Sequence, residues 1–308
     1  MTSPPPSASV ALNLLTVDVE DYFQVSGFAH AVPPDTWDAR TSRVVDNTTR
    51  LLDLFDEADV RGTFFILGWV ADRFPALVRR VAKAGHQIAS HGYAHRLVYD
   101  MTPAEFRADL RRASTVIEAA CGVVVDGFRA PSFSITERSR WAFDVLIDEG
   151  YTYDSSVFPI VRDRYGIPGS PRHAHVMTRE AGALWEVPPS TIRWSGVNVP
   201  IAGGGYFRLF PYSWTRAGIE RLNHRERRPA VVYLHPWELD PAQPRISAGA
   251  VSRFRHYVNL DRTEGRLKQL LRDFRFAPMS EAMNAFHPAD VSTTPFGRPL
   301  VSAPQTIG

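Results

Sequence analysis

The sequence predicts an α/β fold in which about seven parallel strands form a closed or nearly closed barrel with helices outside. Strand-like and helix-like segments alternate along most of the chain with short connections, which favours a parallel sheet. The strand-like segments are short apolar runs, as expected for strands that are buried on both faces. Unusual polar residues follow several of these runs, and in such folds the chemistry sits at the carboxyl ends of the strands.

The predicted elements begin with a β-branched, buried strand at 13–19 and a helix at 45–58. Further strands are expected at 62–68, 87–90, 123–129, 151–154, 184–187 and 230–234. Further helices are expected at 75–84, 103–120, 136–149, 212–225 and 263–274. The start of the helix at 103–120 is well marked, because Thr102, Pro103 and Glu105 supply an N-cap, a first-turn proline and the acid of a capping box.

The composition describes an ordinary globular protein. The 308 residues include 35 basic and 33 acidic side chains, and 44% are hydrophobic. This balance excludes nucleic acid as the main partner, since that requires a concentrated basic field. The single cysteine, Cys121, excludes a scaffold held by intrachain disulfides.

The strongest apolar run, 63–71, is about half the length of a membrane-spanning helix, and the N-terminus does not read as a signal peptide. We therefore expect a cytoplasmic protein without direct membrane insertion. The Pro/Ser-rich segment 1–10 is predicted to be a disordered tail, and 289–308 a flexible one. Residues 11–288 are expected to form one domain, with a C-terminal extension from about 240. The sequence leaves open whether the chain forms a homo-oligomer.

Four predicted strands end in polar residues that are costly to bury unless they satisfy one another or a metal. The segments are Asp18-Val19-Glu20-Asp21, Ser90-His91-Gly92-Tyr93-Ala94-His95, Phe128-Arg129-Ala130-Pro131 and Leu234-His235-Pro236. Their coincidence at one rim of the barrel is the strongest functional signal in the sequence.

His91 and His95 are four residues apart, which on a helical turn places both imidazoles on one side. Two histidines and one carboxylate make a three-ligand zinc site with an open position for water. Taken alone, the pair could equally be solvated or capping. Strand periodicity points Asp18 and Glu20 to one side, so one carboxylate can bind metal while the other acts as a base. His235 could protonate a leaving amine, although a single histidine at a strand mouth can also be structural.

These residues stand in motifs that resemble those of the polysaccharide deacetylases, the NodB-homology enzymes of carbohydrate esterase family 4. The motifs are Thr16-Val17-Asp18, Ser90-His91-Gly92-x-x-His95, Arg129-x-Pro131 and Leu234-His235, in this order from about residue 12 to 239. More narrowly, the run from Thr16 to Phe23 and the segment Tyr153-Asp154-Ser155-Ser156 resemble the subfamily found beside exosortase-linked exopolysaccharide gene clusters.

The resemblance implies a distorted, partly open (β/α) barrel and an amide hydrolase that uses a divalent metal, with Zn²⁺ as the expected ion. It makes Asp18 the catalytic base, His235 the general acid, and His91 and His95 metal ligands. Arg129 would orient Asp18 through a charge-assisted hydrogen bond. Asp154 lies near where the family has an acid that tunes the catalytic histidine, so we assign it that role.

One position departs from the family pattern. The family has two adjacent aspartates, whereas Val19 follows Asp18 here and cannot bind metal. Glu20 is the expected third ligand because it shares the strand face with Asp18, and Asp21 is the alternative.

Five residues are expected to contact substrate. The backbone N–H near Tyr93 would hold the oxyanion, and Pro131 belongs to the arginine motif. A glycine-rich loop at 203–205 is expected to present Tyr206 and Arg208 to a sugar chain, because aromatic faces stack on pyranose rings. Trp237 could line the same groove, with core packing as its alternative role.

The primary hypothesis is a metal-dependent deacetylase acting on N-acetylhexosamine units of a cell-surface polysaccharide or exopolysaccharide, or of its precursor. The expected partner is therefore a glycan that contains N-acetylated sugar. The alternatives are an amide hydrolase for a small nitrogenous compound, favoured by a deep and closed site, and a catalytically inactive glycan-binding module.

Overall fold

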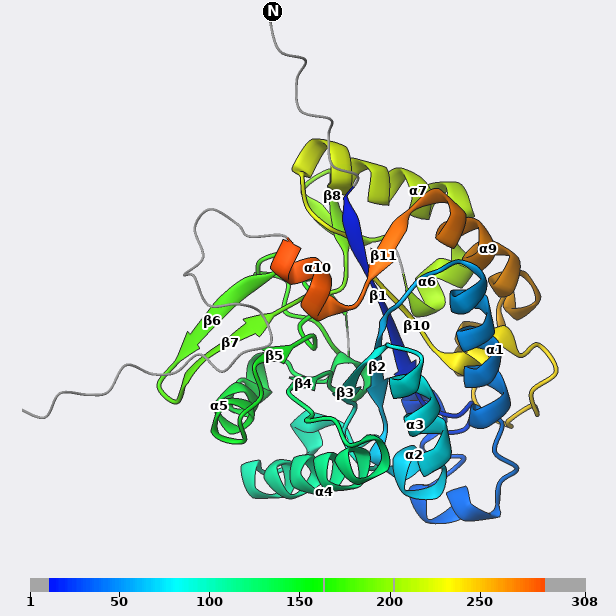
Figure 1. Ribbon diagram of the computed structural model, residues 1–308, viewed down its shortest axis with the longest axis vertical. Helices are drawn as coiled ribbons and strands as arrows, with labels where there is room; N and C mark the ends of the chain where they lie inside the picture. The colour runs from blue at the N-terminus through cyan, green and yellow to red at the C-terminus, as the bar shows by residue number, and fades with distance from the viewer. Residues whose placement is uncertain (1–10, 163, 202, 286–308) are drawn as a thin grey trace, which may run out of the picture.

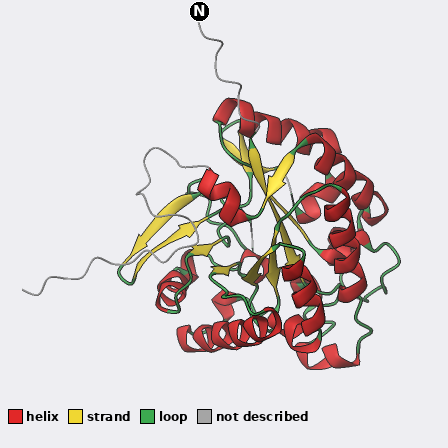
Figure 2. Ribbon diagram, viewed as in Figure 1, coloured by secondary structure: helices red, strands yellow, loops and turns green. Residues whose placement is uncertain are grey.

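The computed structural model describes residues 11–162, 164–201 and 203–285. The predicted tails at 1–10 and 289–308 lie outside the described residues. Within the described ranges, strands and helices alternate as the sequence indicates, and Figures 1 and 2 show the helices surrounding a central group of strands.

The central sheet is mostly parallel and follows the strand order β10-β1-β2-β3-β4-β5-β7-β6, with β11 also paired to β1. Only β6 and β7 pair antiparallel within it. The strands are β1 (Leu12–Val19), β2 (Thr63–Ile66), β3 (Gln87–Ser90), β4 (Gly127–Phe128), β5 (Tyr153–Asp154), β6 (His175–Arg179), β7 (Gly182–Glu186), β10 (Val231–Leu234) and β11 (Arg275–Ala277). The predicted mixed α/β fold with a parallel sheet is confirmed.

The sheet curves into a partly open barrel, and the segment after β7 approaches the other edge at β10. Ser190 N–H donates to the Val231 carbonyl at 3.2 Å, and Val231 N–H donates to Ser190 Oγ at 2.7 Å. A separate hairpin, β8 (Thr191–Trp194) and β9 (Val197–Pro200), follows at this junction. The sequence analysis did not predict this hairpin.

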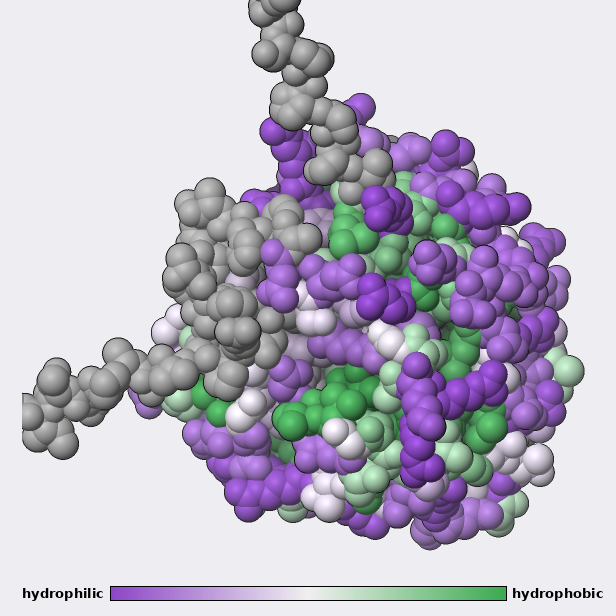
Figure 3. Space-filling model, viewed as in Figure 1, coloured by the Kyte–Doolittle hydropathy of each residue, from purple (hydrophilic) through white to green (hydrophobic). Residues whose placement is uncertain are grey.

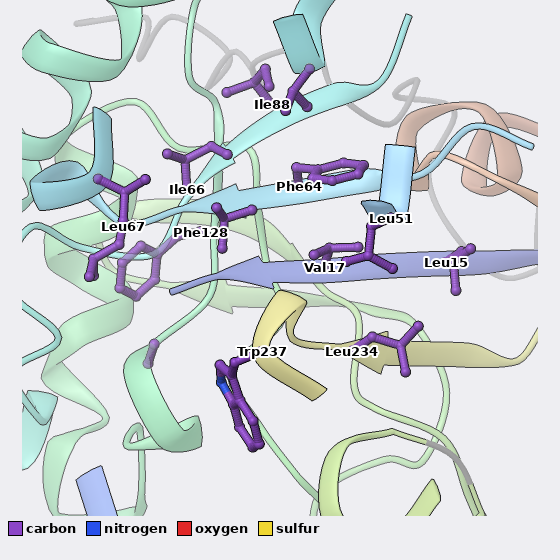
Figure 4. Close-up of a cluster of buried hydrophobic side chains, with 14 of the residues drawn as sticks. Leu15, Val17, Leu51, Phe64, Ile66, Leu67, Ile88, Phe128, Leu234 and Trp237 are labelled. Carbon is purple, nitrogen blue, oxygen red and sulfur yellow. The ribbon is translucent and has the colours of Figure 1, made fainter. Parts of the chain in front are cut away.

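Most of the helices bury an apolar face against the sheet or against neighbouring helices. They are α1 (Val44–Glu57), α2 (Gly68–Arg73), α3 (Pro75–Lys83), α4 (Pro103–Cys121), α5 (Trp141–Asp148), α6 (Gly204–Leu209), α7 (Tyr212–Glu220), α8 (Ala250–Tyr257), α9 (Leu260–Asp273) and α10 (Met279–Ala285). Leu51 of α1 packs in one buried cluster with Leu15 and Val17 of β1 and Phe64 of β2 (Figure 4). This core fixes the strands whose carboxyl ends carry the polar residues.

Helix α4 begins as predicted, because Thr102 Oγ1 accepts from Glu105 N–H while the Glu105 carboxylate accepts from Thr102 N–H. It ends at Gly122, whose φ of 73° provides the left-handed cap that glycine adopts without strain.

Several predicted elements differ in length or type from the expectation. The strand predicted at 123–129 is reduced to Gly127–Phe128, since Val123 and Val124 lie exposed in the connection. The helix predicted at 136–149 begins with a 3₁₀ turn at Glu137–Ser139 and is α-helical only from Trp141. The helix predicted at 212–225 becomes a π-helix at Arg221–Glu226.

None of the helices in the described part of the chain combines the length and the apolar character needed to cross a bilayer. Hydrophilic residues dominate the periphery of the face shown in Figure 3, with apolar residues between them.

Candidate active site

The predicted polar residues meet at the carboxyl edge of neighbouring strands. Asp18 lies at the end of β1, and His91, Arg129 and His235 directly follow β3, β4 and β10. Because β10, β1, β2, β3 and β4 are consecutive in the sheet, their ends form one continuous rim. The grouping expected from the sequence is therefore present in the structure.

Glu20, His91 and His95 form a buried cluster whose nitrogen and oxygen atoms all lie within 4.8 Å of one another. His91 Nδ1 lies 2.8 Å from the Arg129 carbonyl and donates to it, which leaves the Nε2 lone pair free for a metal. Burial lowers the pKa of His91 to about 4, so this imidazole is neutral at pH 7, as a metal ligand must be.

The carboxylate of Glu20 fits the third ligand position. Its Oε2 lies 2.6 Å from His95 Nε2, and its Oε1 accepts from Trp237 Nε1–H at 3.1 Å. Burial alone would raise the pKa of Glu20. The charge and hydrogen bond of His95, together with the charges of His235 and His91, lower this pKa overall. Two imidazole nitrogens and one carboxylate oxygen suit a divalent metal.

The alternative third ligand, Asp21, is engaged elsewhere. Its carboxylate accepts from Ser42 Oγ at 2.6 Å, from Arg43 N–H at 2.8 Å and from Val44 N–H at 3.2 Å. This places a negative charge at the N-terminus of α1, where the helix dipole stabilises it. Asp21 therefore holds the start of α1.

The two histidines are brought together by a loop, which corrects the expected helical turn. Gly92 and His95 both have positive φ, 72° and 53°, and the two imidazole rings lie 5.4 Å apart. The left-handed backbone at these positions turns the chain back so that His95 faces His91.

Asp18 is held by a fully buried arginine. Arg129 Nη1 donates to Asp18 Oδ1 at 2.7 Å and to Thr16 Oγ1 at 2.8 Å. Its Nη2 donates to Ser155 Oγ at 2.9 Å. This is the contact between Arg129 and Asp18 that the resemblance implies, and it fixes the carboxylate in one orientation.

His235 lies across the rim from the carboxylates. Its Nε2 is 3.8 Å from Asp18 Oδ2 and 3.7 Å from Glu20 Oε1. On its other side, Nδ1 lies 2.5 Å from Glu238 Oε1. Burial alone would lower the pKa of His235, but the hydrogen bond and charge of Glu238, with the charges of Glu20 and Asp18, raise it to about 9.

Glu238 is held in turn by Arg208, which corrects the interpretation of Arg208 as a sugar ligand. Arg208 is buried, and its Nε donates to Glu238 Oε2 at 2.7 Å. Its Nη1 donates to the carbonyls of His256 at 2.7 Å and Val258 at 3.2 Å. Arg208 lies in helix α6 rather than in a flexible loop.

The role assigned to Asp154 is also corrected. Asp154 accepts from Ser156 Oγ at 2.6 Å and from Ser156 N–H at 3.0 Å. It forms a buried acid pair with Glu186, whose pKa is raised well above its ordinary value by burial and by the charge of Asp154. Because Ala130 N–H donates to Ser156 Oγ at 2.8 Å, this pair supports the segment next to Arg129, and Glu238 makes the contact to His235.

Tyr93 does not supply the oxyanion N–H. Its backbone N–H donates to Asp109 Oδ2 at 2.8 Å, and its hydroxyl contacts Asp72 and Arg112. Trp237 is also corrected, since it is buried between His235 and His256 and donates to Glu20.

For the two remaining residues, Pro131 and Tyr206, contact with substrate stays a prediction. Pro131 is buried at the start of the turn that follows Arg129. Tyr206 is half-buried in α6, and its hydroxyl accepts from Arg162 Nε at 2.8 Å.

The sequence analysis missed Glu238, although a signal for it was present. His235, Pro236 and Glu238 reproduce the capping-box pattern that was recognised at Thr102, with the histidine as N-cap and the acid three residues later. The same box carries the His235–Glu238 contact.

Comparisons with known proteins match two parts of the chain to two family models. Residues 35–153 match the family model described as polysaccharide deacetylase, and 155–284 match a domain of unknown function, DUF3473. The peptidoglycan-N-acetylglucosamine deacetylase of Bacillus cereus is 31% identical over 96 residues, which is 31% of this chain and 35% of that protein. The match thus spans about a third of this relative.

Two solved structures share the fold. A Mycobacterium smegmatis protein described as a polysaccharide deacetylase has 22% identity and a TM-score of 0.57, covering 91% of this chain and 92% of that one. Puue allantoinase has 14% identity and a TM-score of 0.61, covering 93% and 96%. Both likenesses concern the fold alone.

The partly open barrel thus carries at its rim a buried cluster of two histidines and one carboxylate that could hold a metal ion. The first part of the described chain, 35–153, is thus similar to polysaccharide deacetylases, and 155–284 is similar to the DUF3473 domain.

Proposed function

We propose that this protein is a metal-dependent deacetylase that hydrolyses N-acetyl groups of N-acetylhexosamine units in a glycan. The observation that carries the proposal is the placement of a buried carboxylate and a histidine, Asp18 and His235, beside the Glu20, His91 and His95 cluster. Metal-assisted amide hydrolysis uses a base, an acid and a set of metal ligands at one site, and these residues supply all three.

Glu20, His91 and His95 would hold the metal, and Zn²⁺ suits this donor set. A bound divalent ion would polarise the acetamide carbonyl and make water more acidic. The side-chain chemistry is then divided between the two remaining residues.

Asp18 acts as the base. Arg129 holds one carboxylate oxygen, Oδ1, and leaves Oδ2 directed toward His235 and the centre of the site. This oxygen accepts the proton of the attacking water. The fixed guanidinium keeps the carboxylate oriented, so little reorganisation is needed when the proton moves.

His235 acts as the acid. Its Nδ1–H is held by Glu238, so the proton that can be transferred is the one on Nε2, which faces Asp18 and Glu20. As the C–N bond breaks, this proton goes to the departing sugar nitrogen. The products are acetate and an amino sugar.

The substrate is a glycan made for the cell surface, with exopolysaccharide as the specific class. The names of the curated relatives include peptidoglycan and chitin deacetylases, and the DUF3473 segment supports the exopolysaccharide assignment. We propose that residues 11–288 act as one domain, because strands from both family-matched segments contribute to one sheet.

One observation favours a second candidate, an amide hydrolase for a small nitrogenous compound. Asp18, Glu20, His91 and His95 are all buried, and Trp237 does not line an open groove. A closed site would suit a small substrate better than a polymer. The complete set of Asp18, Arg129 and His235 argues against an inactive binding module.

Acetate release from a β-1,4-linked N-acetylglucosamine oligomer tests the proposal directly. The protein is purified, loaded with Zn²⁺ and assayed beside a sample treated with a chelator. Acetate release by the zinc-loaded sample, with none by the chelator-treated sample, would support the proposed deacetylase activity. Release of ammonia or ring-opened product from small cyclic amides, with no acetate from any oligomer, would replace it with the second candidate.

A further inference from the structure

Aromatic side chains form a strip from helix α6 to the β8–β9 hairpin. The strip consists of Tyr206, Phe210, Trp214 and Trp194. Tyr206 and Phe210 are stacked with ring centroids 6.4 Å apart, Phe210 and Trp214 are 5.7 Å apart, and Trp214 and Trp194 are 5.8 Å apart. Each ring thus contacts the next along two helices and one strand.

The far end of the strip is open to solvent. Trp194 is 58% exposed, and its cross-strand partner Val197 is equally exposed. Ser195 and Gly196 form the two-residue turn between them, both with positive φ, which is the geometry of a tight hairpin. Covering this exposed aromatic surface with a ligand would remove apolar area from water and so favour binding.

The near end of the strip reaches the wall of the candidate active site. Tyr206 contacts Phe158 at 6.2 Å, Phe158 contacts Tyr233 at 6.5 Å, and Tyr233 lies 5.9 Å from His235. Gly203 and Gly204 make this approach possible, because a Cβ at either position would lie within 3 Å of the Tyr233 ring. Phe158 and Tyr233 are buried, so these ring contacts connect the strip to His235 through the protein core.

We propose that the strip binds pyranose rings of the same glycan chain whose acetylated sugar occupies the active site. This inference rests on the proposed function and specifies its substrate as an extended chain. Aromatic faces pack on the apolar C–H faces of sugars, while rim groups bind hydroxyls. Arg162, whose Nε donates to the Tyr206 hydroxyl at 2.8 Å, supplies a polar group of this kind.

The chemistry of the hairpin favours a sugar chain over a lipid surface. The exposed Trp194 and Val197 flank a turn of Ser195 and Gly196, and the charged Arg193 is exposed beside them, so the turn itself is polar. A membrane-inserting hairpin would place apolar residues at that turn, since unpaired backbone and charged groups are costly in lipid.

The test is a comparison of Trp194→Ala with Phe254→Ala. Phe254 lies on α8, outside the strip, and has the same 58% exposure, so its substitution controls for loss of an exposed aromatic ring. Binding of the β-1,4-linked hexamer and dimer of N-acetylglucosamine is measured by titration calorimetry. Circular dichroism checks that both variants remain folded.

We expect Trp194→Ala to weaken hexamer binding about three- to tenfold, in line with the loss of one ring contact. The effect on the dimer is expected to be smaller, and Phe254→Ala is expected to bind the hexamer like the wild type. Equal hexamer affinity in all three proteins, or no hexamer binding by the wild type, would overturn the proposal. So would Trp194-dependent binding to phosphatidylglycerol vesicles without hexamer binding.

Acetate release, measured separately, keeps the two proposals distinguishable. Trp194-dependent hexamer binding without acetate release would retain the strip and reject the deacetylase. Acetate release from the hexamer with no effect of Trp194→Ala on its binding would retain the deacetylase and reject the strip.

Discussion

Glu238 Oε1 lies 2.5 Å from His235 Nδ1, and the same oxygen accepts the His235 backbone N–H at 3.1 Å. One carboxylate oxygen thus fixes both the backbone and the ring of the proposed acid. Arg208 holds the second oxygen at 2.7 Å, so the geometry of His235 depends on a buried chain of charges.

Glu238→Gln tests this relationship. A carboxamide keeps the size and one acceptor but removes the charge that helps to raise the pKa of His235 to about 9. An acid works only while it is protonated, so activity is lost as the pH rises through this pKa. In the variant, this alkaline loss of activity should begin at a lower pH than in the wild type. We expect kcat to fall about 10- to 100-fold at pH 8. The pH–rate profile is the measurement, and an alkaline limb at the wild-type position would contradict the assignment.

Glu20→Ala and Asp21→Ala separate the metal ligand from its neighbour. Removing Glu20 should reduce zinc bound per chain after dialysis, because one of three ligands is lost. Removing Asp21 should leave zinc binding intact but lower the free energy of unfolding by about 1–3 kcal/mol, because Ser42, Arg43 and Val44 lose their acceptor.

Elemental analysis and urea unfolding provide the two readouts for this pair. Equal zinc content in both variants would show that Glu20 is not a ligand. Loss of zinc in a folded Asp21→Ala protein would restore Asp21 as the third ligand.

His86 makes stability depend on pH. Its Nδ1 accepts from Gly62 N–H at 3.1 Å, so the folded protein needs the neutral ring, and burial with the charge of Arg61 lowers its pKa to about 4 from 6.5. This group stabilises the fold fully above pH 6.5, and its contribution is lost as pH falls toward 4. Over that range it amounts to about 1–3 kcal/mol.

His86→Asn should keep an acceptor for Gly62 and remove this titration. Urea unfolding at pH 7 and pH 4.5 should therefore show a smaller loss of stability in His86→Asn than in the wild type. His224→Asn, at an exposed histidine, is the control. An unchanged pH dependence in His86→Asn would refute the prediction.

Local sequence patterns were sufficient to predict most of the parallel strands and the rim of polar residues. The apolar run before Asp18 and the capping box at Thr102 act through neighbouring residues, so they can be read without a structure. The roles of Tyr93, Arg208, Trp237 and Asp154 depended on partners far along the chain, such as Asp109 for Tyr93 and Glu186 for Asp154. No spacing rule identifies those partners.

Two features were misjudged because a local rule has exceptions. The i, i+4 spacing of His91 and His95 suggested a helical turn, but positive φ at Gly92 and His95 produces the same approach in a loop. Val123 and Val124 resembled a strand, yet both are exposed, because β-branched residues also occur in connections.

Asp18→Asn measures the central claim most directly. Asp18 is the proposed base and stands outside the Glu20, His91 and His95 cluster, so zinc content and acetate release are measured on the same zinc-loaded preparation. We expect wild-type zinc content, unchanged folding and acetate release reduced about a thousandfold. Acetate release at the wild-type rate from Asp18→Asn would contradict the assignment of Asp18 as the base.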